Sequence, residues 1–216
     1  MENLNSIKNI IFDIDGTLWD SRQKVAEAFN LVVKEDPRLV DAYPITKERL
    51  TREFGKPLSE IGKSLFPNLT DEENEEVIKA LVERENAYLI DHCRTPYEGV
   101  PELFRTLAKT HKLYIVSNCQ AGYIELFLAN TGLTDCVTDH LCPGDTGLLK
   151  ADSIRLIMER NHLEEAIYIG DTMGDYEAVC AVGIPFVHAA YGFGEVPEAI
   201  HRINRPLELL ALLGMS

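Results

Sequence analysis

Short, continuous apolar runs constrain the fold of this 216-residue chain more than any other feature. They are rich in Ile, Val, Tyr or Phe, which is typical of strands that are buried on both faces. The clear runs cover residues 8–14, 113–117, 166–170 and 184–188. Amphipathic helical patterns lie between and around them, at residues 98–109, 122–130, 151–161 and 174–182. This alternation predicts an α/β fold, a doubly wound parallel sheet with helices on both faces.

The stretch from residue 20 to residue 95 differs, because it contains no convincing strand. Its helical patterns fall at residues 21–34, 46–53, 58–65 and 72–93 and are separated by proline-containing breaks. We therefore predict that residues 20–95 form an inserted α-helical cap domain, and that residues 1–19 and 96–216 form a Rossmann-like core domain. The alternative is that these helices complete a single core. A fifth strand near residues 140–142 and a final helix over 206–213 complete the predicted elements.

Charge and cysteine usage narrow the possible partners. The formal net charge is −14, which disfavours nucleic acid and anionic membrane surfaces as partners. No apolar stretch approaches the ~20 residues that span a bilayer, and the N-terminus lacks the features of a signal peptide. The 5 cysteines form no Cys-x-x-Cys pair, as expected of reduced thiols. These features predict a cytoplasmic protein with no nucleic-acid or membrane partner, and they predict no particular oligomeric state.

The segment Asp13-Ile14-Asp15-Gly16-Thr17 directly follows the first apolar run. Side chains two residues apart on a strand share a face, so both carboxylates can reach one reaction centre. An aspartate can accept a phosphoryl group as an aspartyl phosphate, while a second carboxylate transfers a proton. The alternative is an ordinary turn or a calcium loop. An EF-hand loop needs glutamate at its twelfth position, where this chain has Lys24.

Polar residues follow the other predicted strands as well. Ser117 and Asn118 follow the second strand, and the run from Gly170 to Asp175 follows the third. Ligands of open parallel sheets bind beyond the carboxyl ends of the strands, so these side chains can converge. Taken singly, each could be a turn or a helix cap. Lys150 stands before the helix at Ala151 and is the one lysine between Ser117 and Asp171, with Arg155 and Arg160 as the alternatives.

These segments resemble the four motifs of the haloacid dehalogenase (HAD) superfamily, in their order and placement along nearly the whole chain. The resemblance is to its phosphatases with a helical cap, of the phosphoglycolate phosphatase-like and β-phosphoglucomutase-like kind. Residues 12–18 match the first motif, 116–118 the second, Lys150 the third and 170–175 the fourth. One departure is Ala151, since proline most often follows the lysine in this family.

The resemblance implies a role for each matched residue. Asp13 is expected to be the nucleophile and Asp15 the acid and base. Lys150 is expected to neutralise charge on the phosphoryl group, which Thr17, Ser117 and Asn118 also bind. Four crowded carboxylates need a counter-charge, and Mg²⁺ fits because it prefers oxygen ligands and phosphate. The implied metal ligands are the side chains of Asp13 and Asp171 and the backbone carbonyl of Asp15, with Asp175 supporting or bridging them.

The expected activity is Mg²⁺-dependent hydrolysis of small soluble phosphate esters. Asp15 argues against dehalogenation, because haloacid dehalogenases lack this second aspartate. The Asp-Ile-Asp sequence also differs from the Asp-x-Ala form of phosphonate hydrolases. A phosphomutase is an alternative, but the histidine that such mutases carry ten residues after the second aspartate is Val25 here. A non-catalytic phosphate-binding protein on this fold is a third possibility.

The substrate is less constrained than the reaction. The segment 54–57 is placed like the specificity loop of the family, so Arg52 or Lys56 could contact an anionic substrate; the alternative is a solvated charge at a helix end. Phosphoglycolate, a sugar phosphate, a nucleotide and pyrophosphate all remain open. Residues 191–194, Tyr-Gly-Phe-Gly, could line the entrance of the site or form a flexible turn.

Overall fold

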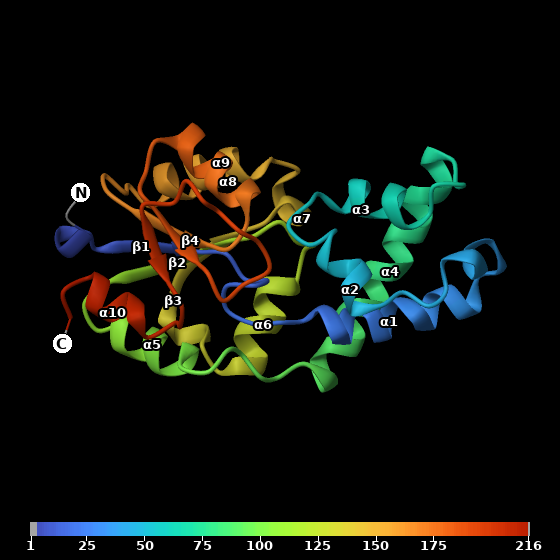
Figure 1. Ribbon diagram of the computed structural model, residues 1–216, viewed down its shortest axis with the longest axis horizontal. Helices are drawn as coiled ribbons and strands as arrows, with labels where there is room; N and C mark the ends of the chain where they lie inside the picture. Colours follow the sequence, from blue (N-terminus) through green and yellow to red (C-terminus); the bar gives the residue numbers. More distant parts are fainter. Residues whose placement is uncertain (1–3, 216) are drawn as a thin grey trace. The chain divides into compact units, whose positions relative to one another are not determined.

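The computed structural model describes residues 4–215, which divide into two compact units (Figure 1). One unit contains the chain up to Asp20 and the chain from Thr95 onward. The other unit contains residues Ser21–Arg94. The first unit carries every strand of the sheet, and the long helices α1 and α4 belong to the second.

The sheet of the first unit has six parallel strands in the order β3-β2-β1-β4-β5-β6. In chain order they are β1 (Asn9–Phe12), β2 (Lys112–Val116), β3 (Val137–Leu141), β4 (Ile167–Gly170), β5 (Phe186–Ala189) and β6 (His201–Ile203). The predicted α/β fold with a parallel sheet is therefore confirmed. The chain reverses direction across the sheet on either side of β1, which pairs with both β2 and β4. This switch point is where open α/β sheets bind ligands.

Helices cover both faces of the sheet (Figure 1). On one face, Ile11 belongs to an apolar cluster with Ile154 of α8 (Lys150–Arg160) and Val179 of α9 (Met173–Val182). On the other face, Phe12 packs on Phe104 of α5, with ring centroids 4.8 Å apart. The remaining α-helices of this unit are α5 (Val100–Leu107), α6 (Tyr123–Thr131), α7 (Pro143–Thr146) and α10 (Glu208–Leu212), and short 3₁₀-helices lie at Leu4–Ser6 and Thr134–Cys136. Burial on both faces explains why β1 is a continuous apolar run.

The second unit is helical, with elements α1 (Arg22–Glu35), α2 (Lys47–Thr51), α3 (Leu58–Leu65) and α4 (Asp71–His92) and a 3₁₀-helix at Pro37–Ala42. The long helix α4 begins at a capping box, in which Thr70 and Glu73 satisfy each other's backbone N–H groups. Helices α1 and α4 pack along each other, and the Tyr88 hydroxyl donates a hydrogen bond to Glu27 between them at 2.9 Å.

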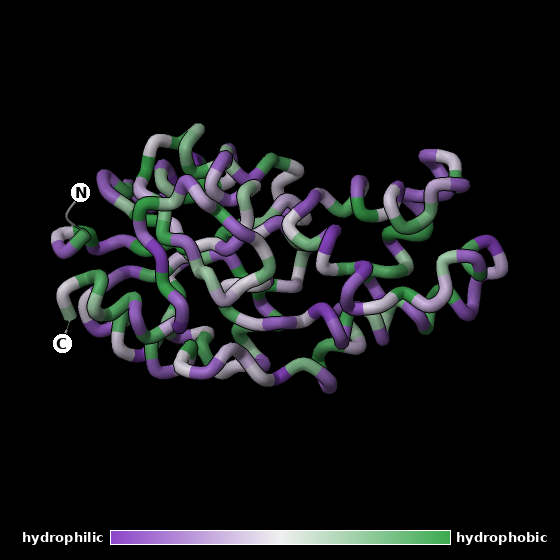
Figure 2. Tube along the Cα trace, in the orientation of Figure 1, coloured by the Kyte–Doolittle hydropathy of each residue, from purple (hydrophilic) through white to green (hydrophobic). Residues whose placement is uncertain are grey.

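Hydrophobic and hydrophilic stretches are interspersed along the chain in both units (Figure 2). Within residues 4–215, no helix has the combined length and apolar character needed to cross a bilayer.

Three details of the sequence prediction were wrong. Strand β3 begins at Val137, earlier than expected, and Lys150 is the first residue of α8 instead of preceding the helix. Strand β6 was not predicted, because it is a three-residue edge strand with one buried side chain, Ile203.

Candidate active site

Asp13 lies at the carboxyl end of the central strand β1. Its backbone N–H donates to the Ile169 carbonyl at 2.9 Å, which continues the pairing with β4. Its side chain is buried, and one carboxylate oxygen accepts a hydrogen bond from Lys150 Nζ at 3.0 Å. Burial raises the pKa of Asp13 to about 7, because the neighbouring Asp175 and Asp15 add to the desolvation that Lys150 opposes. The surroundings of Asp13 therefore raise the free energy of its ionised form.

The turn after Asp13 requires glycine at position 16 for two reasons. Gly16 has φ +84°, a left-handed conformation that residues with a side chain rarely adopt. A Cβ atom there would lie 2.0 Å from Asp171 Oδ2, so the backbone can approach Asp171 only without a side chain. The Gly16 N–H donates to the Trp19 carbonyl at 2.9 Å, which closes the turn. This turn brings the first motif against the fourth.

Lys150 connects Asp13 to Asp175 from the first position of α8. Its Nζ donates to Oδ1 of both carboxylates, and the residue is only 7% exposed. Burial alone would lower the pKa of Lys150, but the charges of Asp13 and Asp175 outweigh it and raise the pKa well above its usual value. Lys150 Nζ also lies over the ring of Tyr168, 5.9 Å from the ring centroid. Lys150 is therefore a buried, permanently charged cation between two carboxylates.

Asp175 lies in the first turn of α9, where it forms a capping box with Thr172. Its Oδ2 accepts hydrogen bonds from the Thr172 hydroxyl at 2.7 Å and from the Asp171 N–H at 3.2 Å. Burial favours a higher pKa for Asp175, but Lys150 and the Thr172 hydrogen bonds hold the pKa below its usual value. Asp175 is therefore ionised and positions both Lys150 and the backbone of Asp171.

Asp171 is fully buried at the end of β4, and its pKa is raised well above the usual value by burial and by the charges of Asp175 and Asp13. Carboxylate oxygens of Asp13, Asp171 and Asp175 lie within 4.8 Å of one another. One lysine cannot balance three buried carboxylates, so the donor set fits a hard dication such as Mg²⁺. Because Lys150, Thr172 and a backbone N–H already occupy Asp175, we expect Asp13 and Asp171 to be the side chains that hold the metal.

The loop after β5 completes the surroundings of Asp171, and sequence reasoning had left its role open. The Phe193 N–H donates to Asp171 Oδ2 at 2.6 Å, and the Tyr191 hydroxyl donates to the Thr17 carbonyl at 2.8 Å. A Cβ atom on Gly192 would lie 2.3 Å from Asp171 Cβ. The loop thus packs directly on Asp171. The two glycines that closely follow a strand were the sequence signal for such a close approach.

Asp15 lies beside this cluster and accepts two hydrogen bonds on one oxygen. Trp19 Nε1–H donates to Oδ1 at 3.2 Å, and the Tyr123 hydroxyl donates to the same atom at 2.8 Å. Neither Trp19 nor Tyr123 was singled out from the sequence. The Tyr123 contact joins the first motif to helix α6, 108 residues away, so no local pattern could have shown it. Trp19 lies in the turn next to Asp15, where the sequence gives no sign of the direction of its indole.

The expected phosphate-binding residues lie at the same end of the sheet. Ser117 is buried directly after β2, and its N–H donates to the Leu141 carbonyl at 3.4 Å; Asn118 follows it. Thr17 is fully buried, and its hydroxyl lies 3.5 Å from Asp171 Oδ1. The structure therefore brings Thr17 directly to the carboxylate cluster.

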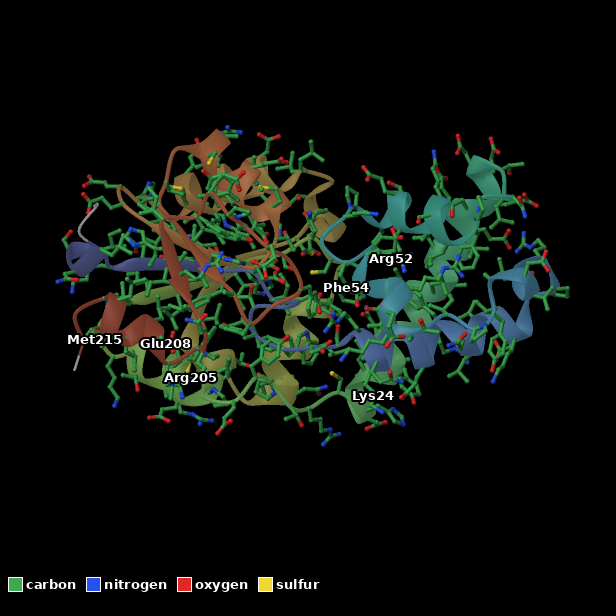
Figure 3. The ribbon with its side chains drawn as sticks, in the orientation of Figure 1. Lys24, Arg52, Phe54, Arg205, Glu208 and Met215 are labelled. Carbon is green, nitrogen blue, oxygen red and sulfur yellow. The ribbon has the colours of Figure 1, made fainter. Side chains whose placement is uncertain are left out.

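Arg52 and Lys56 belong to the helical unit, where Figure 3 labels Arg52 next to Phe54. Arg52 follows the last residue of α2. Lys56 Nζ forms an ion pair with Glu53 Oε2 at 2.9 Å. The charge of Lys56 therefore has a partner within the helical unit.

The chain belongs to the family of haloacid dehalogenase-like hydrolases, which residues 10–189 match. The resemblance found in the four motifs is thereby confirmed. Phosphoglycolate phosphatases of Aquifex aeolicus and Photobacterium profundum are 28% and 29% identical to this chain. The alignments cover 94% and 89% of this chain and 95% and 87% of those proteins. A Listeria monocytogenes pyrophosphatase is 28% identical over 80% of this chain and 78% of its own.

Solved structures show the same fold. A haloacid dehalogenase-like family hydrolase from Streptococcus pneumoniae has a TM-score of 0.75 and 24% identity, with 95% of this chain and 98% of that chain covered. A HAD-superfamily hydrolase from Geobacter sulfurreducens has a TM-score of 0.72 and 20% identity, with 99% of each chain covered. The likeness therefore extends over both the α/β unit and the helical unit.

Proposed function

We propose that this protein is a Mg²⁺-dependent phosphomonoesterase that hydrolyses small soluble phosphate esters through an aspartyl phosphate. The observation that carries the proposal is the buried Asp13–Lys150–Asp175 arrangement with Asp171 beside it. Relatives named phosphoglycolate phosphatase support a small, anionic ester as substrate. The pyrophosphatase relative keeps pyrophosphate among the candidates.

In the first step, an oxygen of Asp13 attacks phosphorus and the bond from phosphorus to the leaving oxygen breaks. Asp15 gives its proton to that leaving oxygen. In the second step, water attacks phosphorus, Asp15 accepts the proton of the water, and the bond between phosphorus and Asp13 breaks. Inorganic phosphate and free Asp13 result, so the two steps balance.

The neighbouring groups lower the barrier by electrostatics. Lys150 holds the Asp13 carboxylate and faces the charge that develops on the transferring group. Ser117, Asn118 and Thr17 are proposed to bind the phosphate oxygens. Asp13 and Asp171, with the Asp15 carbonyl, would hold Mg²⁺, which supplies positive charge to the phosphoryl oxygens.

We further propose that the helical unit acts as a cap that selects the substrate, with Arg52 and Lys56 as candidate contacts to an anionic leaving group. Val25, at the position where mutases of this family carry histidine, favours hydrolysis over phosphate transfer between sugar positions. A mutase would yield an isomeric phosphate ester, whereas a hydrolase yields free phosphate.

The test is phosphate release from p-nitrophenyl phosphate and from a panel containing 2-phosphoglycolate, sugar phosphates, nucleotides and pyrophosphate. We expect activity with Mg²⁺, loss of activity with excess chelator, and loss in the Asp13→Asn variant. Activity that survives either treatment would contradict the mechanism. Phosphate-analogue binding without turnover of any panel member would favour a non-catalytic binding protein instead.

A further inference from the structure

The side chain of Asp15 is held from two directions. Trp19 Nε1–H and the Tyr123 hydroxyl both donate to its Oδ1, at 3.2 and 2.8 Å. The two donors come from different parts of the unit, the turn after β1 and the start of helix α6. We propose that Trp19 and Tyr123 are positioning residues, which orient Asp15 for proton transfer to the leaving oxygen. The inference rests on the proposed phosphatase function and adds two residues to it.

Both donors are themselves immobilised by packing. Trp19 is 0% exposed and Tyr123 1% exposed, so neither side chain has room to turn. The Trp19 ring makes edge contacts with the rings of Tyr123 and Phe127, at centroid distances of 5.7 and 5.0 Å. Such aromatic pairs hold their geometry in the core. A carboxylate that accepts hydrogen bonds from fixed donors is itself fixed.

The backbone of Trp19 is fixed as well. Its carbonyl accepts the Gly16 N–H at 2.9 Å, and bridge pairing joins Trp19 to both Asp15 and Pro96. The indole therefore cannot shift without opening the turn that carries Asp13 and Asp15. Proton transfer depends on geometry at the scale of a few tenths of an ångström, so this rigidity serves the chemistry directly.

The two donors also decide which oxygen carries the proton. An indole N–H can only donate a hydrogen bond, so Oδ1 remains an acceptor in both protonation states of Asp15. In this proposal Oδ2 carries the transferable proton and gives it to the leaving oxygen. The same oxygen then takes the proton of the attacking water in the second step. Trp19 and Tyr123 thus assign different roles to the two oxygens of one carboxylate.

The dependence on leaving group tests the proposal. Nitrophenolate leaves without a proton, whereas the alkoxide of benzyl phosphate needs one, and phenyl phosphate lies between. The three esters are similar in size. In Tyr123→Phe, which removes the hydroxyl and keeps the ring, kcat/KM should fall at least about tenfold more on benzyl phosphate than on p-nitrophenyl phosphate. The ratio kcat/KM is chosen because it reports the step in which the leaving group departs.

Two further variants sharpen the experiment. Trp19→Phe removes the second donor, and the same graded loss is expected. Phe127→Leu is the matched control, because it removes a ring contact with Trp19 but no donor to Asp15. Its effect on kcat/KM should be equal for the three esters. The folding of each variant is checked by its urea unfolding transition.

Equal losses on all three esters in Tyr123→Phe and Trp19→Phe would overturn the inference and leave the phosphatase function intact. Unfolding of both variants would also overturn it, because the two groups would then serve stability. If the wild-type protein releases phosphate from none of the three esters, the proposed function fails first, so the two failures are distinguishable.

Discussion

Replacing Asp13 with asparagine should stabilise the protein in the absence of divalent cations, although it removes the proposed nucleophile. The reason is the pKa of Asp13, which burial and nearby carboxylates raise from 3.8 to about 7. Below about pH 4 both the folded and the unfolded chain carry this proton. As the pH rises from about 4 to about 7, the unfolded chain ionises first, so the free energy of unfolding falls.

The magnitude follows from the two pKa values. At 1.36 kcal/mol for each pH unit, the change from 3.8 to about 7 corresponds to about 4 kcal/mol of lost stability above pH 7. Asparagine has nearly the same shape and does not ionise, so the variant avoids this loss. The charge of Asp13 also contributes to the raised pKa of Asp171, so the variant relieves part of that shift as well. Both effects raise the stability of the variant above that of the wild type as the pH increases.

The assay is urea unfolding at a series of pH values with excess chelator. The stability of Asp13→Asn should exceed that of the wild type increasingly from pH 4 to pH 8. The matched control is Asp139→Asn. Burial favours a higher pKa for Asp139, but the hydrogen bond from Asn161 and the ion pair with Arg160 lower the pKa below its usual value. The ionised Asp139 therefore stabilises the fold, and its replacement should destabilise the protein. An Asp13→Asn variant that is less stable than the wild type at pH 8, or that shows the same pH slope, would refute the reasoning.

Three further outcomes are expected. Lys150→Met leaves Asp13 and Asp175 buried without their cation, and should cost about 3–5 kcal/mol in urea unfolding and about 10²–10³-fold in kcat. Gly192→Ala places a Cβ 2.3 Å from Asp171 Cβ and should weaken Mg²⁺ binding measured by calorimetry, whereas Gly174→Ala, with its nearest atom at 3.7 Å, should leave that binding unchanged. Adding Mg²⁺ to the chelator-treated wild type should raise its unfolding midpoint, and this rise should be smaller in Asp13→Asn, which offers a weaker ligand; an equal rise would place the ion elsewhere.

Sequence patterns predicted the parts of the sheet that are buried on both faces. Strands β1, β2, β4 and β5 are apolar runs, and their signal is strong because helices cover both of their faces. Strand β3 was placed poorly, since its inner residues Thr138, Asp139 and His140 are polar and only Leu141 is buried. The edge strand β6 was missed for the same reason, since Ile203 is its one buried residue.

Some residues of the candidate site could likewise be predicted from the sequence, and others could not. Asp13, Asp171 and Asp175 could be predicted because short local motifs follow strand ends, and Lys150 because no other lysine was available. The structure brings these four together. Tyr123 and the loop at residues 191–194 could not be assigned, because their roles arise from contacts between segments far apart in the chain. Tertiary proximity of that kind leaves no periodic pattern in one sequence. Trp19 is close to Asp15 in the sequence, but no periodic pattern indicates that its indole reaches that carboxylate.

The central place of β1 in the sheet has a consequence for biosynthesis. Its partners are β2, in which Ile115 pairs with Phe12, and β4, in which Ile167 pairs with Ile10. Contacts over such separations make folding slow, and β1 leaves the ribosome before either of the strands that it pairs with. Asp13 therefore meets Lys150 and Asp171 only when most of the polypeptide has been translated. A nascent chain cannot assemble the repelling carboxylates before the lysine that balances them is present.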